Sequence, residues 1–283
     1  MEQTVGFSSS GLKLVGVLHV PERTGKRPGL VLCHGFGGNC RGAGHPELAR
    51  ALERAGYAVL RFDFRGCGES EGKRGNIICA EEVEDARSAV GFLAAHEAVD
   101  GERIGIVGAS LGGSIAIELA AGDPRVKLCV ANGAIGKGER RFRYQYPDET
   151  RWRAFLRQLE DAKRASDGGR PTLINRFDIV EIPPASRAGL PPGATMEFTV
   201  ETALSMLAHE PERVVAKIAP RPLLLLHPRG DKVVPVTESE NLAKAAGANC
   251  ELRIIESHDH FGVGAPPQTT ILLDWLGRNL SAA

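Results

Sequence analysis

Residues 108–112 read G-A-S-L-G and place a serine hydroxyl between two glycines. The string directly follows an apolar run, 103–107, and opens a helical pattern that begins at Leu111. This G-x-S-x-G context is typical of a nucleophile elbow, a sharp strand-to-helix turn in which small neighbours leave room for a strained serine. The following helix offers free N–H groups and the positive end of its dipole. We therefore predict that Ser110 is a nucleophile.

Two other interpretations of this turn stay open. The first is a glycine-rich turn with an incidental serine. The second is a dinucleotide-binding turn, because G-x-G-x-x-G also lies between a strand and a helix. Ser110 stands where the second glycine would let backbone approach pyrophosphate, so its side chain argues against that cofactor. Neither HExxH, a paired CxxC nor GxxxxGK[ST] occurs, and the sequence predicts no cofactor and no metal.

A second glycine-rich string, L-C-H-G-F-G-G at 32–38, ends another apolar run. An ester carbonyl under nucleophilic attack becomes an oxyanion, which needs fixed hydrogen-bond donors. The backbone N–H of Leu111, directly after the serine, is one candidate donor. The N–H of Phe36, in this second string, is the other. The alternative is an ordinary glycine loop.

Three motifs occur in a fixed order along the chain: H-G-F-G-G at 34–38, D-x-R-G-x-G-x-S at 63–70 and G-x-S-x-G-G at 108–113. In this combination the chain resembles the α/β-hydrolase superfamily. Within it, the chain is similar to the esterase and serine-aminopeptidase-like branch that includes the cinnamoyl and feruloyl esterases. The resemblance implies an α/β-hydrolase fold, with a mostly parallel central sheet flanked by helices and an inserted lid.

The resemblance covers residues 11–131 and 222–280 but not the segment between them. It implies that the D-x-R-G string is structural, with Asp63 and Arg65 tying loops together.

The acid and the base of a catalytic triad are also implied by the resemblance. A serine hydroxyl needs a neighbouring base, for which histidine suits neutral pH, and a carboxylate orients the imidazole. In this fold the order is Ser, Asp, His. Asp231 follows the apolar run 223–227, in register with Val234-Pro235, although the family pattern G-x-x-D-x-x-V-P reads G-D-K-V-V-P here. The alternative is a turn-forming aspartate.

Two histidines follow the expected strand 251–255, His258 and His260. The resemblance favours His260, because the family's histidine usually precedes a small or aromatic residue and Phe261 follows here. His258 stays the alternative base.

Buried strands alternate with amphipathic helices along the chain, which predicts a mostly parallel sheet covered on both faces. A half-exposed antiparallel strand is expected at 11–20. The expected buried strands are 29–33, 57–62, 103–107, 126–131, 223–227 and 251–255, and the expected helices are 46–55, 80–96, 111–121 and 268–280.

Residues 136–212 break this alternation, because they show no core strand and are interrupted by prolines. Helical patterns occupy 151–165 and 199–209. A long segment between two strands is better explained as a lid or cap than as a loop. We therefore predict a hydrolase core of residues 1–135 and 213–283 with an inserted lid at 136–212.

Residues 136–165 carry nine Lys or Arg and five Asp or Glu, in a chain whose net charge is zero. Aromatic residues lie among them, and Tyr144, Tyr146 and Trp152 are candidate substrate-binding residues. One interpretation is a solvated amphipathic lid. The other is a lid that closes over an aromatic or anionic acyl group.

The bulk composition of the 283 residues excludes some function classes. Thirty-five Lys and Arg balance 35 Asp and Glu, so no overall charge favours nucleic acid or an anionic membrane. No apolar stretch approaches the roughly 20 residues of a membrane span, and no signal peptide is recognisable, so we expect a cytoplasmic protein. The six cysteines are spread along the chain, which favours reduced thiols.

Together these features predict a serine hydrolase that cleaves carboxylic esters of small or medium acyl groups. An acyl thioesterase and a small-peptide or amide hydrolase with the same triad are the alternatives. A non-catalytic binding module is disfavoured because all three triad residues are present. The expected partner is a small-molecule acyl substrate, and the oligomeric state stays open, a homodimer included.

Overall fold

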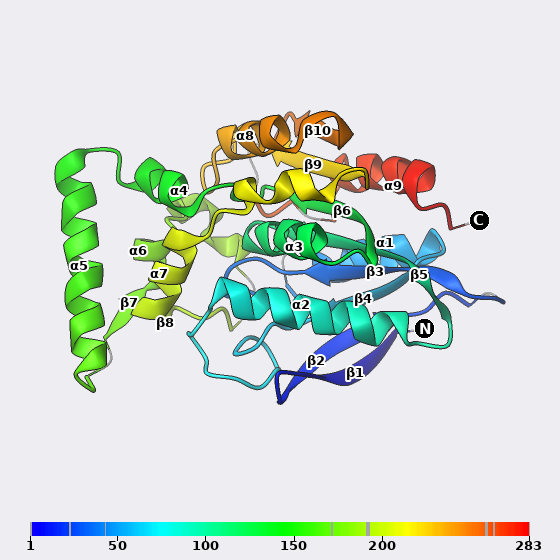
Figure 1. The fold of residues 1–283 in the computed structure, drawn as a ribbon, viewed down its shortest axis with the longest axis horizontal. Coiled ribbons are helices and arrows are strands. Elements are labelled where there is room, and N and C mark those ends of the chain that lie inside the picture. The colour runs from blue at the N-terminus through cyan, green and yellow to red at the C-terminus, as the bar shows by residue number, and fades with distance from the viewer. Residues whose placement is uncertain are drawn as a thin grey trace.

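The computed structural model describes residues 2–22, 24–42, 44–170, 172–190, 193–257, 260–262 and 264–282. Its main sheet has eight strands in the order β1-β2-β4-β3-β5-β6-β9-β10 (Figure 1). The strands from β4 to β10 run parallel, and β2 runs antiparallel to both of its neighbours. The strands are β1 Glu2–Ser9, β2 Leu12–His19, β3 Arg27–Cys33, β4 Ala58–Phe62, β5 Val99–Ala109, β6 Val126–Asn132, β9 Leu223–Pro228 and β10 Cys250–Ile255.

Helices cover both faces of this sheet because its central strands are apolar on both sides. Side chains alternate along β3, so Val31 and Cys33 face one core cluster while Leu30 and Leu32 face the other. Helices α2, α3 and α8 pack on the first face, and α1 and α9 pack on the second. Their bounds are α1 His45–Arg54, α2 Cys79–Ala94, α3 Leu111–Gly122, α8 Thr237–Ala246 and α9 Gln268–Asn279.

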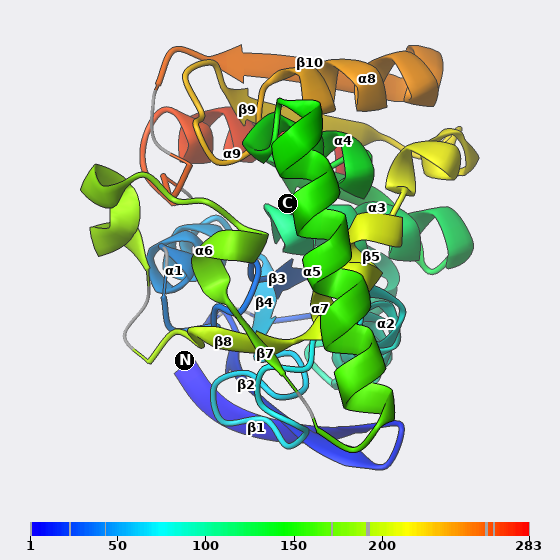
Figure 2. The same ribbon diagram turned by 90° about the vertical axis from the view of Figure 1, so that its left-hand side faces the viewer.

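We call the chain between β6 and β9 the insertion. Its described residues contribute no strand to the main sheet. The insertion lies at the end of the sheet opposite the two termini (Figure 1). Seen from that end, α5 lies in front of the other elements (Figure 2). β7 and β8 pair antiparallel as a separate small sheet. The longer elements are α4 Gly138–Gln145, α5 Glu149–Asp167, β7 Leu173–Asn175, α6 Arg176–Ile179, β8 Glu197–Thr199 and α7 Val200–Ala208, and the 3-10 turns are Pro184–Gly189, Pro211–Arg213 and Val215–Ile218. A last 3-10 turn, Gly247–Asn249, lies outside the insertion, before β10.

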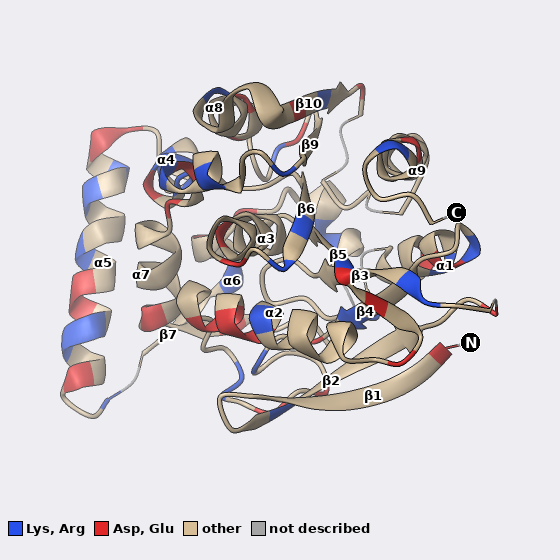
Figure 3. Ribbon diagram, turned by 45° about the vertical axis from the view of Figure 1, so that its right-hand side comes forward, with Lys and Arg blue, Asp and Glu red and all other residues tan. Residues whose placement is uncertain are grey.

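The charges of α5 alternate in sign along its length (Figure 3). Arg143 on α4 pairs with Glu139 at 3.2 Å and with Glu149 at 3.3 Å, and Arg153 pairs with Glu149 at 2.9 Å. All four side chains are about half exposed or more. Exposed pairs of this kind stabilise a helix only weakly, by up to about 0.5 kcal/mol each. These pairs favour the interpretation of this surface as a solvated face.

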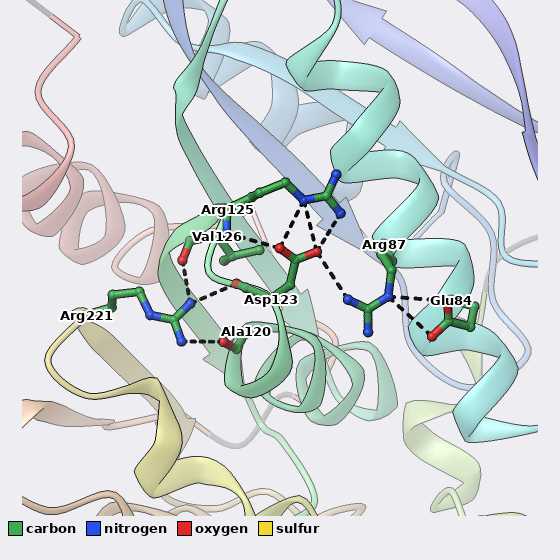
Figure 4. Close-up of polar contacts among 7 residues, drawn as sticks. All are labelled: Glu84, Arg87, Ala120, Asp123, Arg125, Val126 and Arg221. Carbon is green, nitrogen blue, oxygen red and sulfur yellow. Dashed lines mark hydrogen bonds and ion pairs between the residues drawn. The ribbon is translucent and has the colours of Figure 1, made fainter.

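Arg221, which precedes β9, closes the carboxyl end of α3 (Figure 4). Its guanidinium donates to the carbonyl oxygens of Ala120 at 2.6 Å, Asp123 at 2.9 Å and Val126 at 2.8 Å. The last carbonyls of a helix lack partners within the helix, and a cation there also interacts favourably with the helix dipole. The Asp123 carboxylate in turn accepts from Arg125 at 2.6 Å. Arg221 therefore holds the carboxyl end of the helix whose first residue, Leu111, follows Ser110.

We expect Arg221→Met to lower the free energy of unfolding by about 2–3 kcal/mol, because the carbonyls of Ala120, Asp123 and Val126 lose a charged donor, as does that of Ile218. Urea unfolding followed by circular dichroism measures this loss. Arg157→Met, at an exposed position of α5, serves as the control and should stay within about 0.5 kcal/mol of the wild type. Equal stability of the two variants would contradict the assigned role of Arg221.

Candidate active site

Ser110 lies in the tight turn between β5 and α3 with a left-handed backbone, φ 55° and ψ −125°. Its N–H donates to the carbonyl oxygen of Asn132 on β6 at 2.8 Å. A Cβ at Gly112 would lie 2.3 Å from the carbonyl oxygen of His34, and one at Gly108 would lie 2.1 Å from that of Gly112. The turn therefore needs glycine at both positions, as the G-x-S-x-G pattern predicts, and its strain is characteristic of functional sites.

The loop after β3 packs directly against this turn. A Cβ at Gly35 would lie 3.2 Å from Cβ of Ser110, and the neighbouring Phe36 is buried. Neither the N–H of Phe36 nor that of Leu111 has a hydrogen-bond partner among the described residues. Buried backbone donors are almost always paired. Two unpaired donors beside a nucleophile are the arrangement that an oxyanion requires.

Asp231 and His260 form a short hydrogen-bonded pair. Oδ2 of Asp231 accepts from Nδ1 of His260 at 2.5 Å, and its Oδ1 accepts from the N–H groups of Val233 at 2.8 Å and Val234 at 3.0 Å. Burial favours a higher pKa for Asp231, but the His260 side chain and the two N–H donors outweigh it, so the pKa lies below its usual value. The aspartate is therefore held ionised beside the imidazole.

Gly133, directly after β6, lies against this pair with φ +58°, and a Cβ there would lie 3.4 Å from Cε1 of His260. Ser110, Asp231 and His260 follow the carboxyl ends of β5, β9 and β10, which meet at one edge of the parallel sheet.

Ser110 and His260 line one cavity, together with Phe36. No hydrogen bond joins Ser110 Oγ to His260 in the described part of the chain. Catalytic hydrogen bonds are often long before substrate binds. The arrangement can supply a nucleophile, an oriented imidazole and two oxyanion donors. The alternative base, His258, lies outside the described residues.

The insertion supplies one wall of this cavity through Arg176, Val180, Ile182 and Leu190. Sequence reasoning did not identify any of these four. They lie in or after a four-residue helix and in irregular chain, where apolar residues show no period that could be recognised.

The three aromatic residues predicted to bind substrate are not among the residues that line the cavity. Tyr144 is 47% exposed on the outer surface. Tyr146 stacks on Phe155 at 4.5 Å and donates its hydroxyl to the Asp178 carbonyl, while Trp152 is buried against Phe155. Tyr146 and Trp152 thus pack with Phe155 inside the insertion, while Tyr144 is exposed. The substrate-binding role of the three residues stays a prediction that the lining of this cavity does not support.

Asp63 and Arg65 tie loops together, as the resemblance implied. The Asp63 carboxylate accepts from the N–H groups of Cys40 at 2.6 Å and Glu69 at 2.8 Å. Arg65 forms a salt bridge with the buried Asp85 of α2 at 2.6 Å.

Across the described ranges, no group of three or more His, Cys, Asp or Glu side chains is arranged to hold a metal ion. No described helix has the length and apolarity needed to cross a membrane.

Residues 30–270 match the family model described as alpha/beta hydrolase family. The chain belongs to the alpha/beta hydrolase family. This confirms the fold class and the family expected from the motifs.

Among curated relatives, two uncharacterized 31.7 kDa proteins of Escherichia coli are 41% and 40% identical over 131 residues. These alignments cover 46% of the chain and 45% of each relative, so the match spans about half their length. Thiohydrolase aneE of Aspergillus aculeatus is 29% identical over 89% of the chain and 84% of its own length.

Solved structures show the same fold at low identity. The alpha/beta hydrolase GrgF from Penicillium sp. sh18 superposes with a TM-score of 0.82, at 22% identity over 99% of both chains. Est1E from Butyrivibrio proteoclasticus, with bound ferulic acid, superposes with a TM-score of 0.70, at 19% identity over 97% of this chain and 96% of that one.

The lowered pKa of Asp231 makes stability depend on pH. Its ionised carboxylate stabilises the folded state above the usual aspartate pKa of about 4, and this contribution is lost as the pH falls through the lower folded value. We expect Asp231→Asn to destabilise the protein by about 1–3 kcal/mol at pH 7 and to weaken the loss of stability in acid. Urea unfolding from pH 3 to 7 tests this, with the exposed Asp161→Asn as control. Parallel pH curves for wild type and Asp231→Asn would contradict it.

Proposed function

We propose that the protein is a serine hydrolase that cleaves carboxylic esters of small or medium acyl groups through an acyl-enzyme. The observation that carries this proposal is that the strained Ser110, His260 and Phe36 line one cavity. Asp231 binds His260 from behind this lining, and the N–H groups of Phe36 and Leu111 have no partner among the described residues.

In the proposed first step, Ser110 Oγ attacks the ester carbonyl carbon while Nε2 of His260 takes the hydroxyl proton. The carbonyl oxygen becomes an oxyanion, which the N–H groups of Phe36 and Leu111 stabilise. His260 then passes its proton to the leaving alcohol as the C–O bond breaks. Asp231 holds Nδ1–H of His260 throughout and stabilises the imidazolium.

In the second step, His260 takes a proton from water, and the resulting hydroxide attacks the acyl carbonyl. The bond to Ser110 breaks, the serine oxygen recovers its proton from His260, and the carboxylic acid leaves. No bound metal or organic cofactor takes part in this sequence.

The side chains around the reacting centre favour an apolar acyl group. Val180, Ile182 and Leu190 from the insertion and Phe261 beside His260 line the cavity. In this proposal residues 136–212 act as a lid that excludes water from the acyl-enzyme.

Thioester hydrolysis is the second candidate, because the relative named a thiohydrolase aligns over 89% of the chain. The same residues serve both reactions, and only the leaving group differs.

We expect wild type to release p-nitrophenol from p-nitrophenyl esters of short to medium acyl chains, and Ser110→Ala to lose at least about 10⁴-fold in kcat. Ser88→Ala, on α2, is the matched control and should keep wild-type turnover, since its hydroxyl donates to Ser9 Oγ, and neither serine lines the cavity. S-acyl thioesters of the same acyl chains, followed by thiol release, rank the two candidates through kcat/KM. Undiminished turnover in Ser110→Ala would contradict the mechanism.

A further inference from the structure

Arg176, the first residue of α6, reaches from the insertion to the loop that carries Phe36. Nη2 donates to the carbonyl oxygen of Phe36 at 2.6 Å, and Nη1 donates to those of Gly37 at 3.4 Å and Thr195 at 2.9 Å. The residue is 3% exposed, yet it lines the cavity that contains Ser110. One side chain therefore connects the insertion to the candidate oxyanion hole.

Two aromatic rings lie beside the Arg176 guanidinium. Its Cζ lies 5.1 Å from the ring centre of Phe36 and 5.9 Å from that of Phe198, and these two rings stack at 4.4 Å. A Cβ at Gly37 would lie 2.7 Å from the Phe198 ring and 2.8 Å from Nη1 of Arg176. The backbone of residues 36 and 37 thus packs directly against Arg176 and Phe198, and position 37 has no room for a residue larger than glycine.

In the part of the chain that the structure describes, the charge of Arg176 has no carboxylate partner and its Nε has no hydrogen-bond partner. Burial lowers its pKa to about 10, so it still carries its proton at neutral pH. By contrast, Arg65, which ties loops together, is neutralised by Asp85. An unpaired buried charge is costly for stability, and such groups concentrate at functional sites.

The carbonyl group of Gly35, on the other side of Phe36, is also fixed by hydrogen bonds. The carbonyl oxygen of Gly35 accepts from Nδ1 of His34 at 2.9 Å and from the N–H of Gly38 at 3.0 Å. The N–H of Phe36 belongs to the same planar peptide and points to the opposite side. Arg176 fixes the next peptide plane through the Phe36 carbonyl. Both planes that flank residue 36 are therefore set, and its N–H stays unpaired beside Ser110.

We infer that Arg176 is a positioning residue that holds the N–H of Phe36 in place for the oxyanion, so that the insertion completes the oxyanion hole. This inference rests on the proposed serine-hydrolase function. A donor fixed in this way acts on the transition state more than on the bound substrate. Loss of Arg176 therefore lowers kcat and leaves KM nearly unchanged.

The test uses Arg176→Met with a neutral p-nitrophenyl ester. We expect kcat to fall about 10- to 100-fold, less than for outright removal of an oxyanion donor, with KM within about threefold. The rate at which a fluorophosphonate modifies Ser110 should fall by a similar factor, because its phosphoryl oxygen needs the same donors. Arg143→Met, whose guanidinium stacks over Trp152 at 4.7 Å on the outer face, is the matched control and should keep wild-type rates.

Two further variants separate positioning from general structure. Arg176→Lys keeps the charge but cannot bridge the same carbonyls, so we expect an intermediate loss of kcat, and this variant replaces Arg176→Met if the latter does not fold. For Arg176→Ala, millimolar guanidinium chloride should restore part of kcat, whereas urea at the same concentration should not.

Unchanged kcat and phosphonylation rates in folded Arg176 variants would overturn the inference while leaving the proposed function intact. A rise in KM confined to carboxylate-bearing esters, with kcat for the neutral ester unchanged, would also overturn it and make Arg176 a substrate-binding group. Wild type that neither turns over esters nor reacts with fluorophosphonate at Ser110 would overturn both proposals.

Discussion

The left-handed backbone of Ser110 is the constraint on which the rest of the site depends. An L-residue adopts this conformation only where its surroundings enforce it. Here β6 binds the Ser110 N–H through Asn132, and the carbonyls of Cys33 and His34 lie so close to Gly112 that no Cβ would fit. The elbow, β3 and β6 therefore support one another. The close packing of Gly112 on the Cys33 and His34 carbonyls also places the Phe36 loop next to Ser110. The N–H of Phe36 can then donate to an oxyanion in the proposed mechanism.

Two buried arginines of the insertion contact the loops on either side of the candidate site. Arg176 binds the carbonyls of the Phe36 loop, and Arg141 donates to the carbonyl of Val233, beside Asp231, at 3.2 and 3.3 Å. Their guanidinium groups bind carbonyl oxygens and, for Arg141, the Gln145 side chain, and neither forms a salt bridge with a described carboxylate. The insertion is thus joined by hydrogen bonds to both catalytic loops of the proposed mechanism. This favours a fixed wall over a segment that only covers the entrance.

The sequence predicted the core strands and the elbow because their signals are local. Apolar runs mark buried strands, and G-x-S-x-G needs only its own strand and helix. The edge strand Glu2–Ser9 was missed, since its residues are mostly polar and exposed, and so was the helix Thr237–Ala246. Asp231 and His260 could be predicted only with the help of the family resemblance. They are 29 residues apart in the sequence, so no local pattern reveals the hydrogen bond between them.

The insertion was predicted least well. Its aromatic residues gave a visible pattern, but they pack on one another, as Tyr146 does on Phe155. Nothing in the local sequence distinguishes Arg176 from the other arginines of the insertion. The proposed role of Arg176 follows from its hydrogen bonds to the carbonyls of Gly37 and Phe36, which lie 139 and 140 residues away along the chain. A periodic sequence pattern cannot indicate contacts of this kind.

The central claim is that Ser110 carries the acyl group during turnover. The most direct measurement is acid quenching of the enzyme within the first turnovers of a p-nitrophenyl ester, followed by peptide mass spectrometry. The account predicts one acyl adduct, located on Ser110, that disappears as product forms and is absent from Ser110→Ala. Turnover without an adduct on Ser110, or with the acyl group on another residue, would contradict it.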